Sequence, residues 1–308
     1  MKHPIKMLLL AASAATFLLV TLPAYAQRLG GFEELGLEIE APSARILPME
    51  AVPLTVTLRN RQDHPVVGHE FLDSPYLKVY LAPEGAPFAQ VRVYPGLDSS
   101  VIMQEVQMPI GYKLSHDVVL WYGETQEGEG KAMFPLPGSY LLKVGLSSVD
   151  YKTSIESNTL TIRVVTPTGA DSAAWACLKQ ESAGDQIDSF LFFVPSAPDR
   201  RAERRRKLED FALRFSASKY AAYAWYTVGL ACCSKSDRDA AGASYEKALN
   251  RKDFPLRHEL LYRLSSVYLT QGDIPNAKRY LSVLRSEYPS SNLIASVSQD
   301  ISTAEKAK

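Results

Sequence analysis

The segment WYTVGLACC at residues 225–233 and the segment LYRLSSVYL at residues 261–269 are two copies of one pattern, 36 residues apart. Downstream of the first copy, Ala241, Tyr245 and Ala248 recur with the same offset as apolar or small residues. Each copy places its first apolar set at i, i+3, i+4 and i+7 and its second set at i, i+4 and i+7, which is one face of each of two helices. Small residues at 229, 241, 265 and 277 allow the two helices of each pair to approach each other closely. The repeat therefore predicts two antiparallel helix pairs.

These positions resemble the tetratricopeptide repeat, in which Trp or Leu, Gly, Tyr, Ala, an aromatic residue and Pro recur with a period of about 34 residues. The matching residues are Trp225, Gly229, Ala241, Tyr245 and Ala248 in the first copy and Leu261, Leu264, Tyr268, Gly272, Ala277 and Pro289 in the second. The extra length is expected in the turn 251–255. A degenerate earlier repeat ends at 208–218, preceded by candidate helices at 172–179 and 186–194. An amphipathic helix from Leu293 to Ile301 is expected to cover the last repeat.

The resemblance implies a binding groove lined by first-helix positions beside the core face. These positions hold no Lys, Arg or Asn, so a clamp for a terminal carboxylate is not expected. The tyrosines predict an apolar, aromatic groove for a hydrophobic peptide or helix. The alternative is that the tyrosines pack against a neighbouring helix such as 186–194. The candidate groove residues are Tyr223, Tyr226, Leu230, Cys233, Glu259, Tyr262, Ser266 and Leu269.

Residues 33–166 show a period of two instead, which indicates half-buried strands. Strands are predicted at 37–39, 54–58, 77–81, 91–94, 118–122, 140–144 and 160–164. Seven or eight short strands without intervening helices predict two antiparallel sheets packed as a β-sandwich. The stretch from Leu136 to Tyr140 is similar to the tyrosine corner of immunoglobulin-like domains, so an immunoglobulin-like or fibronectin-like architecture is expected.

The change of period at Pro167 to Gly169 predicts a domain boundary. The predicted fold is multidomain, β then α: an antiparallel β-sandwich domain at 33–166, followed by an α-helical tetratricopeptide-like repeat domain at 170–308.

Residues 1–26 have the pattern of a signal peptide. Lys2 and Lys6 precede an apolar run from Met7 to Leu22, and the small residues Ala24 and Ala26 form a cleavage site. The run of about 16 residues is shorter than the ~20 needed to span a bilayer, which disfavours the alternative of an uncleaved anchor. A lipoprotein would require a Cys directly after the cleavage site, and this sequence has none there. The mature chain is therefore expected to be exported and soluble, in the periplasm or secreted.

The charges balance, with 34 Lys plus Arg against 34 Asp plus Glu, which argues against nucleic acid as a partner. Six cationic residues nevertheless fall within eight positions. On a helix they surround most of the surface, which indicates a solvated linker helix; the alternative is peripheral contact with anionic components of the envelope. The residues are Arg200, Arg201, Arg204, Arg205, Arg206 and Lys207.

No catalytic, metal or cofactor motif occurs in the chain. A Gly-x-Ser-x-Gly elbow and a His-Glu-x-x-His helix are absent, and the glycine-rich stretch 123–131 lacks the Lys-Ser or Lys-Thr of a phosphate loop. His64 and His69 lie in a Pro-containing segment that is interpreted as an exposed loop. No cofactor and no metal are predicted.

The three cysteines are Cys177, Cys232 and Cys233, an odd number, so at least one is unpaired within the chain. A bridge from Cys177 to one of the other two is left open. Burial as small apolar side chains is the favoured interpretation.

These patterns predict a non-enzymatic cell-envelope protein that mediates protein–protein interactions through a helical-repeat groove, as a scaffold or assembly factor. One alternative is carbohydrate or cell-wall binding through the sandwich, with Trp121 or Tyr122 as a stacking platform. Another is an enzyme whose catalytic residues converge from distant loops, which leave no local motif.

Overall fold

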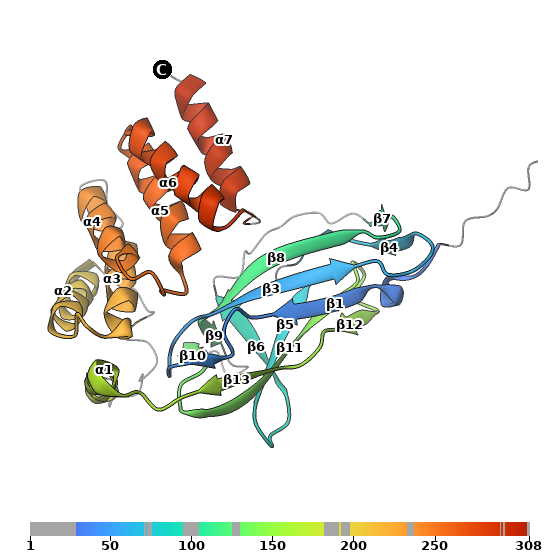
Figure 1. Cartoon of the computed structure of the whole chain (residues 1–308), viewed down its shortest axis with the longest axis horizontal. Helices are drawn as coiled ribbons and strands as arrows, with labels where there is room; N and C mark the ends of the chain where they lie inside the picture. The colour runs from blue at the N-terminus through green and yellow to red at the C-terminus, as the bar shows by residue number, and fades with distance from the viewer. Residues whose placement is uncertain are drawn as a thin grey trace, which may run out of the picture.

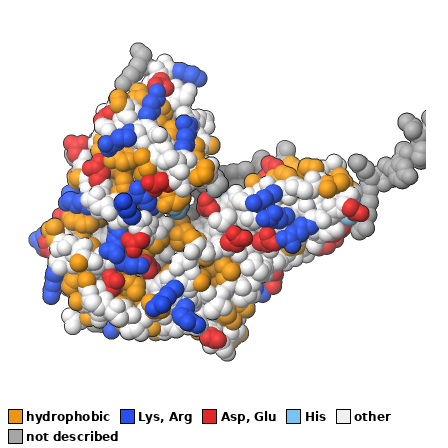
Figure 2. Space-filling model, in the orientation of Figure 1, with side chains coloured by type: hydrophobic (Ala, Val, Ile, Leu, Met, Phe, Trp, Pro, Cys, Tyr) orange, Lys and Arg blue, Asp and Glu red, His pale blue; other side chains and the backbone are white. Residues whose placement is uncertain are grey.

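The chain folds as a β region followed by a helical arm (Figure 1). The computed structural model describes residues 29–70, 72, 76–94, 105–124, 130–181, 191, 198–232, 237–289, 291 and 293–306. The space-filling view shows the arm rising from one end of the elongated β region (Figure 2). The expected signal peptide at 1–26 lies outside the described residues.

Each of the seven predicted stretches overlaps a strand. These strands are β1 (Gly36–Glu40), β3 (Val52–Arg59), β5 (Leu77–Pro83), β6 (Ala89–Tyr94), β8 (Lys113–Leu120), β11 (Gly138–Ser147) and β13 (Leu160–Val164). The described residues add six strands too short for alternation to reveal. These are β2 (Arg45–Ile46), β4 (Val66–Gly68), β7 (Val106–Met108), β9 (Tyr122–Glu124), β10 (Gly130–Ala132) and β12 (Ser154–Glu156).

The strands form three sheets within the described part of the chain. One has the order β1-β3-β8, one has the order β10-β9-β6-β5-β11-β13-β2 with β12 beside β11, and β4 pairs with β7. The prediction of antiparallel sheets is wrong at one edge, because β2 runs parallel to β13, with Arg45 opposite Arg163 and Ile46 opposite Val164. This parallel pair leads on one side to residues 47–51 and on the other to the first helix.

The two larger sheets share one hydrophobic core. Alternate residues of β3, among them Leu54 and Val56, are buried in the same cluster as Leu142 and Val144 of β11. Tyr140 closes the turn before β11, since its hydroxyl donates to the carbonyl of Leu136 at 3.0 Å. The alternating pattern in the sequence thus corresponds to one buried face in each sheet.

The helical arm contains α1 (Gly169–Glu181), α2 (Pro198–Arg214), α3 (Lys219–Ala231), α4 (Arg238–Leu249), α5 (Arg257–Thr270), α6 (Ile274–Glu287) and α7 (Leu293–Lys306). The candidate helix at 172–179 lies within α1, whereas the one at 186–194 lies outside the described residues except for Leu191. The hydroxyl of Ser218 accepts a hydrogen bond from the N–H of Tyr220 at 3.1 Å and so caps the start of α3.

The 36-residue repeat corresponds to the pairs α3/α4 and α5/α6, each packed along its length. A Cβ at Gly229 would lie 2.3 Å from the ring of Tyr245, so only glycine allows α3 and α4 to approach this closely. In the second pair, the hydroxyl of Ser265 donates to the carbonyl of Ala277 at 2.7 Å. The small residues of the repeat therefore set the distance between the helices.

The last helix covers the end of the second pair. Val297 and Ile301 of α7 are buried in one cluster with Leu281 of α6, as the amphipathic pattern of residues 293–301 predicts. Among the described helices, none has the length and the apolar character that crossing a membrane requires.

Candidate protein-interaction site

Helix α3 binds the segment that connects β2 to β3, residues 47–51. The hydroxyl of Tyr220 donates to the carbonyl of Pro48 at 2.8 Å, and the N–H of Ala51 donates to the hydroxyl of Tyr223 at 2.8 Å. From the other side, Nε1 of Trp121 donates to the carbonyl of Met49 at 3.1 Å. Three aromatic side chains thus hydrogen-bond to the main chain of one short segment.

Aromatic packing surrounds these hydrogen bonds. The ring centroid of Trp121 lies 5.2 Å from that of Tyr223 and 5.6 Å from that of Tyr226, and Phe254 lies 4.8 Å from Tyr223. Such pairs add stability beyond the area that they bury. Leu47 and the rings belong to a single buried cluster that continues into the helices, so the β region and the arm share a core.

A buried carboxylate lies at the same contact. Glu50 is 3% exposed, and its Oε2 accepts the N–H of Leu47 at 2.6 Å. Lys219 places its Nζ 3.4 Å from Oε1 of Glu50 and 3.7 Å from a carboxylate oxygen of Asp253. Burial raises the pKa of Glu50, while the N–H of Leu47 and the charge of Lys219 act in the opposite direction.

The prediction of an open groove on α3 is wrong. Tyr223 is 0% exposed and Tyr226 is 5% exposed, because the face that was expected to bind a separate peptide packs against the β region. Leu191 joins the same cluster, and its carbonyl accepts the hydroxyl of Thr227. Leu230 is half-buried against this core, and Cys233 lies outside the described residues.

The candidate positions on α5 have a different environment. Tyr262 and Leu269 are half-buried against the cluster that α6 forms with α7. Glu259 is bound by Arg263 at 2.7 Å, and the hydroxyl of Ser266 donates to the carbonyl of Tyr262 at 3.1 Å. The structure therefore does not unite the two predicted sets in one groove: the α3 tyrosines contact the β region, and Tyr262 contacts the end of the arm.

The basic run lies on α2, where part of its charge is neutralised. Arg205 pairs with Glu209 at 2.9 Å and Asp237 at 3.7 Å, and Lys207 pairs with Glu203 at 3.0 Å. The run remains the most basic stretch of the arm. Arg201 and Arg204 are half-buried, whereas Arg200 and Arg206 are exposed.

The interpretation of His64 and His69 as parts of an exposed loop is wrong. His64 is 8% exposed, with Nε2 3.0 Å from Glu34 and Nδ1 2.8 Å from Asp63. His69 is fully buried, and its Nε2 lies 2.8 Å from the carbonyl oxygen of Ser147. Both are covered because residues 30–35 fold back over this segment, with the N–H of Gly30 donating to the carbonyl of residue 65.

The described residues place no three His, Cys, Asp or Glu side chains where they could hold a metal ion. Cys177 is half-buried and Cys232 is buried, and no disulfide joins the two. Trp121 is 9% exposed and packed between the tyrosines of α3, which removes it as a platform for sugar stacking.

Comparisons with known proteins reveal no family. No family model matches the chain, and no curated protein matches it. Among solved structures, a β-glucosidase from Erythrobacter marinus is 17% identical with a TM-score of 0.24, over 41% of this chain and 15% of that one.

The sporulation control protein Spo0M from Bacillus subtilis is 9% identical with a TM-score of 0.25, over 48% of this chain and 55% of that one. The CARDB domain of the PF1109 protein from Pyrococcus furiosus is 14% identical with a TM-score of 0.21, over 45% of this chain and 95% of that one. The chain thus spans a small part of the β-glucosidase and about half of Spo0M. Likenesses of this size carry no argument about family or function.

Proposed function

We propose that this protein is a non-enzymatic scaffold or assembly factor of the bacterial cell envelope, which binds other proteins through its helical arm. In this proposal the arm is a tetratricopeptide-like repeat array, and the β region is an immunoglobulin-like sandwich. The constant offset of 36 residues and the requirement for glycine at Gly229 support the first assignment. The shared core of the two larger sheets and the Tyr140 corner support the second.

One observation carries the proposal: α3 already binds a chain segment, residues 47–51, by hydrogen bonds to its main chain and by aromatic packing. Repeat arrays recognise peptides in this way, since stacked helix pairs present rigid side chains to a bound segment. Because this segment and Trp121 occupy the face of α3 that carries Tyr220, Tyr223 and Tyr226, a separate partner must bind elsewhere on the arm. The surfaces that remain are those of α2, α4, α6, the turns between them and the face of α3 that lies toward the end of α4.

Export is part of the proposal and rests on Lys2, Lys6 and the cleavage pattern ending at Ala26. The mass of the intact protein from osmotic-shock fluid tests it, and the expected N-terminal residue is Gln27. A membrane-bound protein that retains residues 1–26 would contradict cleavage.

Site-specific photo-crosslinking in intact cells tests the binding function. A photoreactive residue replaces Leu213 on α2 (65% exposed) or the exposed Ser282 on α6, and control variants carry it at Leu136 (60% exposed) or Tyr151 (53% exposed) on the β region. We expect the same protein adduct from both arm positions and none from the control positions. Variant folding is checked by circular dichroism.

The opposite results point to the alternative functions. Adducts to polysaccharide from Leu136 or Tyr151, without protein adducts from the arm, would replace the proposal by carbohydrate or cell-wall binding. Absence of any adduct from the arm, combined with turnover of a small molecule by the purified protein, would replace it by an enzymatic function.

A further inference from the structure

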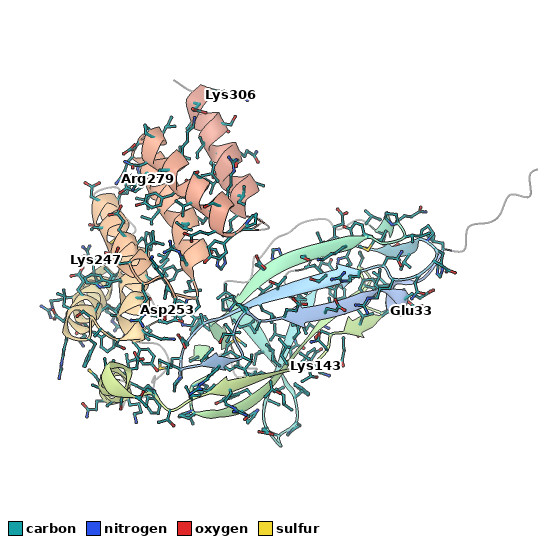
Figure 3. All side chains as sticks on the ribbon, viewed as in Figure 1. Glu33, Lys143, Lys247, Asp253, Arg279 and Lys306 are labelled. Carbon is teal, nitrogen blue, oxygen red and sulfur yellow. The ribbon has the colours of Figure 1, made fainter. Side chains whose placement is uncertain are left out.

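A depression of about 520 Å³ lies where the start of α3 meets the end of α4. Its apolar part consists of Trp225 with Ala221 and Ala222, and cationic side chains come from the end of α4 and the following turn, among them Lys247 and Lys252. Figure 3 shows Lys247 on α4 and Asp253 in the turn before α5. We call this depression the Trp225 pocket. Its size falls within the ~300–1,000 Å³ range of ligand sites.

The pocket carries an excess of positive charge. Three cations line it, Lys247, Arg251 and Lys252, against the single carboxylate of Asp253. Asp253 is itself neutralised, because Nε of Arg251 lies 2.9 Å from one of its oxygens and Nζ of Lys219 lies 3.7 Å from the other. Two lysines therefore remain to attract an anion.

Neither lysine forms an ion pair within the described part of the chain. Nζ of Lys247 lies 3.9 Å from the ring centroid of Trp225, a cation–π contact that holds the ammonium at the edge of the pocket. Lys252 is exposed in the turn after α4.

The floor of the pocket is apolar and well packed. Trp225 is 9% exposed, and Ala221 and Ala222 are 5% and 4% exposed, all three within the buried core of the arm. A bare inorganic anion gains nothing from such a floor, because apolar surface stabilises only ligands that bury apolar area of their own. The surface complements a ligand that combines carboxylates with aliphatic side chains.

We propose that the Trp225 pocket binds an acidic peptide segment of a partner protein, in which Asp or Glu alternates with an aliphatic residue. The carboxylates lie between Lys247 and Lys252, and the aliphatic side chain lies on Trp225. This inference rests on the proposed function and names the partner chemistry and the place on the arm where the partner binds.

The experiment measures binding of a fluorescein-labelled peptide of alternating Glu and Leu to the full mature chain by fluorescence anisotropy. Peptides of alternating Gln and Leu and of alternating Lys and Leu serve as ligand controls. The test variant is Lys247→Glu with Lys252→Glu. The matched control is Arg200→Glu with Lys306→Glu, two exposed residues that change the net charge equally and lie outside the pocket.

We expect the acidic peptide to bind the wild type and the matched control alike, and the test variant at least about tenfold more weakly, which equals about 1.4 kcal/mol. Circular dichroism should give the same helix content for all three proteins at the temperature of the binding measurement, since the replaced side chains are exposed. Equal weakening in the matched control would show an effect of net charge alone and overturn the assignment. Equal binding of the Gln-Leu peptide would overturn it too.

Inorganic phosphate is added as a competitor. If millimolar phosphate abolishes peptide binding, the pocket is a small-anion site and the peptide assignment is wrong. The outcome is separable from the proposed function, because protein adducts at Leu213 or Ser282 test that function without using the pocket. Adducts at those positions with no peptide binding would overturn the pocket alone.

Discussion

The N–H of Ala51 donates to the hydroxyl of Tyr223 at 2.8 Å, across 172 residues of sequence. Both residues are fully buried, one directly before strand β3 and the other in helix α3. A buried N–H requires an acceptor, so this hydrogen bond makes the position of the helical arm contribute to the stability of the full chain.

Replacing Tyr223 by Phe should lower the free energy of unfolding by about 1–3 kcal/mol, since the buried N–H of Ala51 loses its acceptor while the ring remains. Urea denaturation measures the change. Tyr262→Phe is the matched control, because the Tyr262 hydroxyl makes no hydrogen bond among the described residues, and it should change stability by less than about 0.5 kcal/mol. Equal effects of the two substitutions would show that the hydroxyl of Tyr223 is dispensable.

Gly229→Ala should destabilise the protein by about 1–3 kcal/mol, because the new Cβ would lie 2.3 Å from the ring of Tyr245 and force α3 and α4 apart. Gly242→Ala in α4 is the control. There a Cβ would meet only Val267 at 3.6 Å, an ordinary contact, so alanine should stabilise the helix by about 0.5–1 kcal/mol. Thermal unfolding should therefore shift in opposite directions, and a stabilising Gly229→Ala would contradict the close packing.

The buried carboxylate of Glu50 should make stability depend on pH. Its folded-state pKa is raised above 4.5 by burial, so between 4.5 and that raised pKa the folded state binds a proton that the unfolded state releases. The stability that Glu50 contributes is therefore fully present below pH 4.5 and is lost as the pH rises through the pKa of Glu50 in the folded state. The unfolding free energy of the wild type, relative to Glu50→Gln, should increase as the pH falls from neutral toward 4.5.

Glu203→Gln is the control for this titration. Glu203 is exposed, and the hydrogen bond from Lys207 lowers its pKa. Its contribution to stability is therefore present above pH 4.5 and is lost on further acidification. The difference in unfolding free energy between the wild type and Glu203→Gln should not increase as the pH falls from neutral to 4.5. Should the Glu50 difference stay flat over the same range, the carboxylate is solvated in the folded protein.

The fragments 27–167 and 170–308 should each fold, with β-rich and helix-rich circular dichroism respectively. Because Tyr220, Tyr223 and Tyr226 are buried against the β region, the helical fragment alone exposes apolar surface and should melt at a lower temperature than the same helices in the full chain. Adding fragment 27–167 should raise that melting temperature, since it binds the folded helices.

A helical fragment that carries Tyr223→Phe should gain less from the same addition. An unchanged melting temperature on mixing would mean that the contact forms only when the chain is continuous.

Periodicity predicted the secondary structure well, because it reports which side of an element is apolar. All seven predicted strands and both repeat pairs are present, and the small residue at Gly229 has the expected packing role. The very short strands were missed, since two or three residues cannot display a period. The parallel pairing of β2 with β13 has no local signal, because it joins Arg45 to Arg163 across more than a hundred residues.

The candidate site was only partly predictable for a related reason. A face rich in tyrosine binds a separate peptide or a segment of its own chain through the same chemistry, and periodicity does not identify which. The available signal was the connection from Leu47 to Ala51, which is apolar except for Glu50 and therefore unusual for a solvent-exposed turn. The burial of His64 and His69 was missed because a polar loop composition says nothing about the residues that fold over it.

The contact between residues 47–51 and α3 also determines the order in which the protein can be completed. A chain synthesised from its N-terminus presents the β strands first, and domains generally fold as they emerge. Residues 47–51 are synthesised about 170 residues before the helix that binds them, and until then water must supply the hydrogen bond of the Ala51 N–H. Until Tyr220 and Tyr223 of α3 have been synthesised, residues 47–51 and Trp121 expose an apolar surface. A chaperone would be needed most during this stage of synthesis.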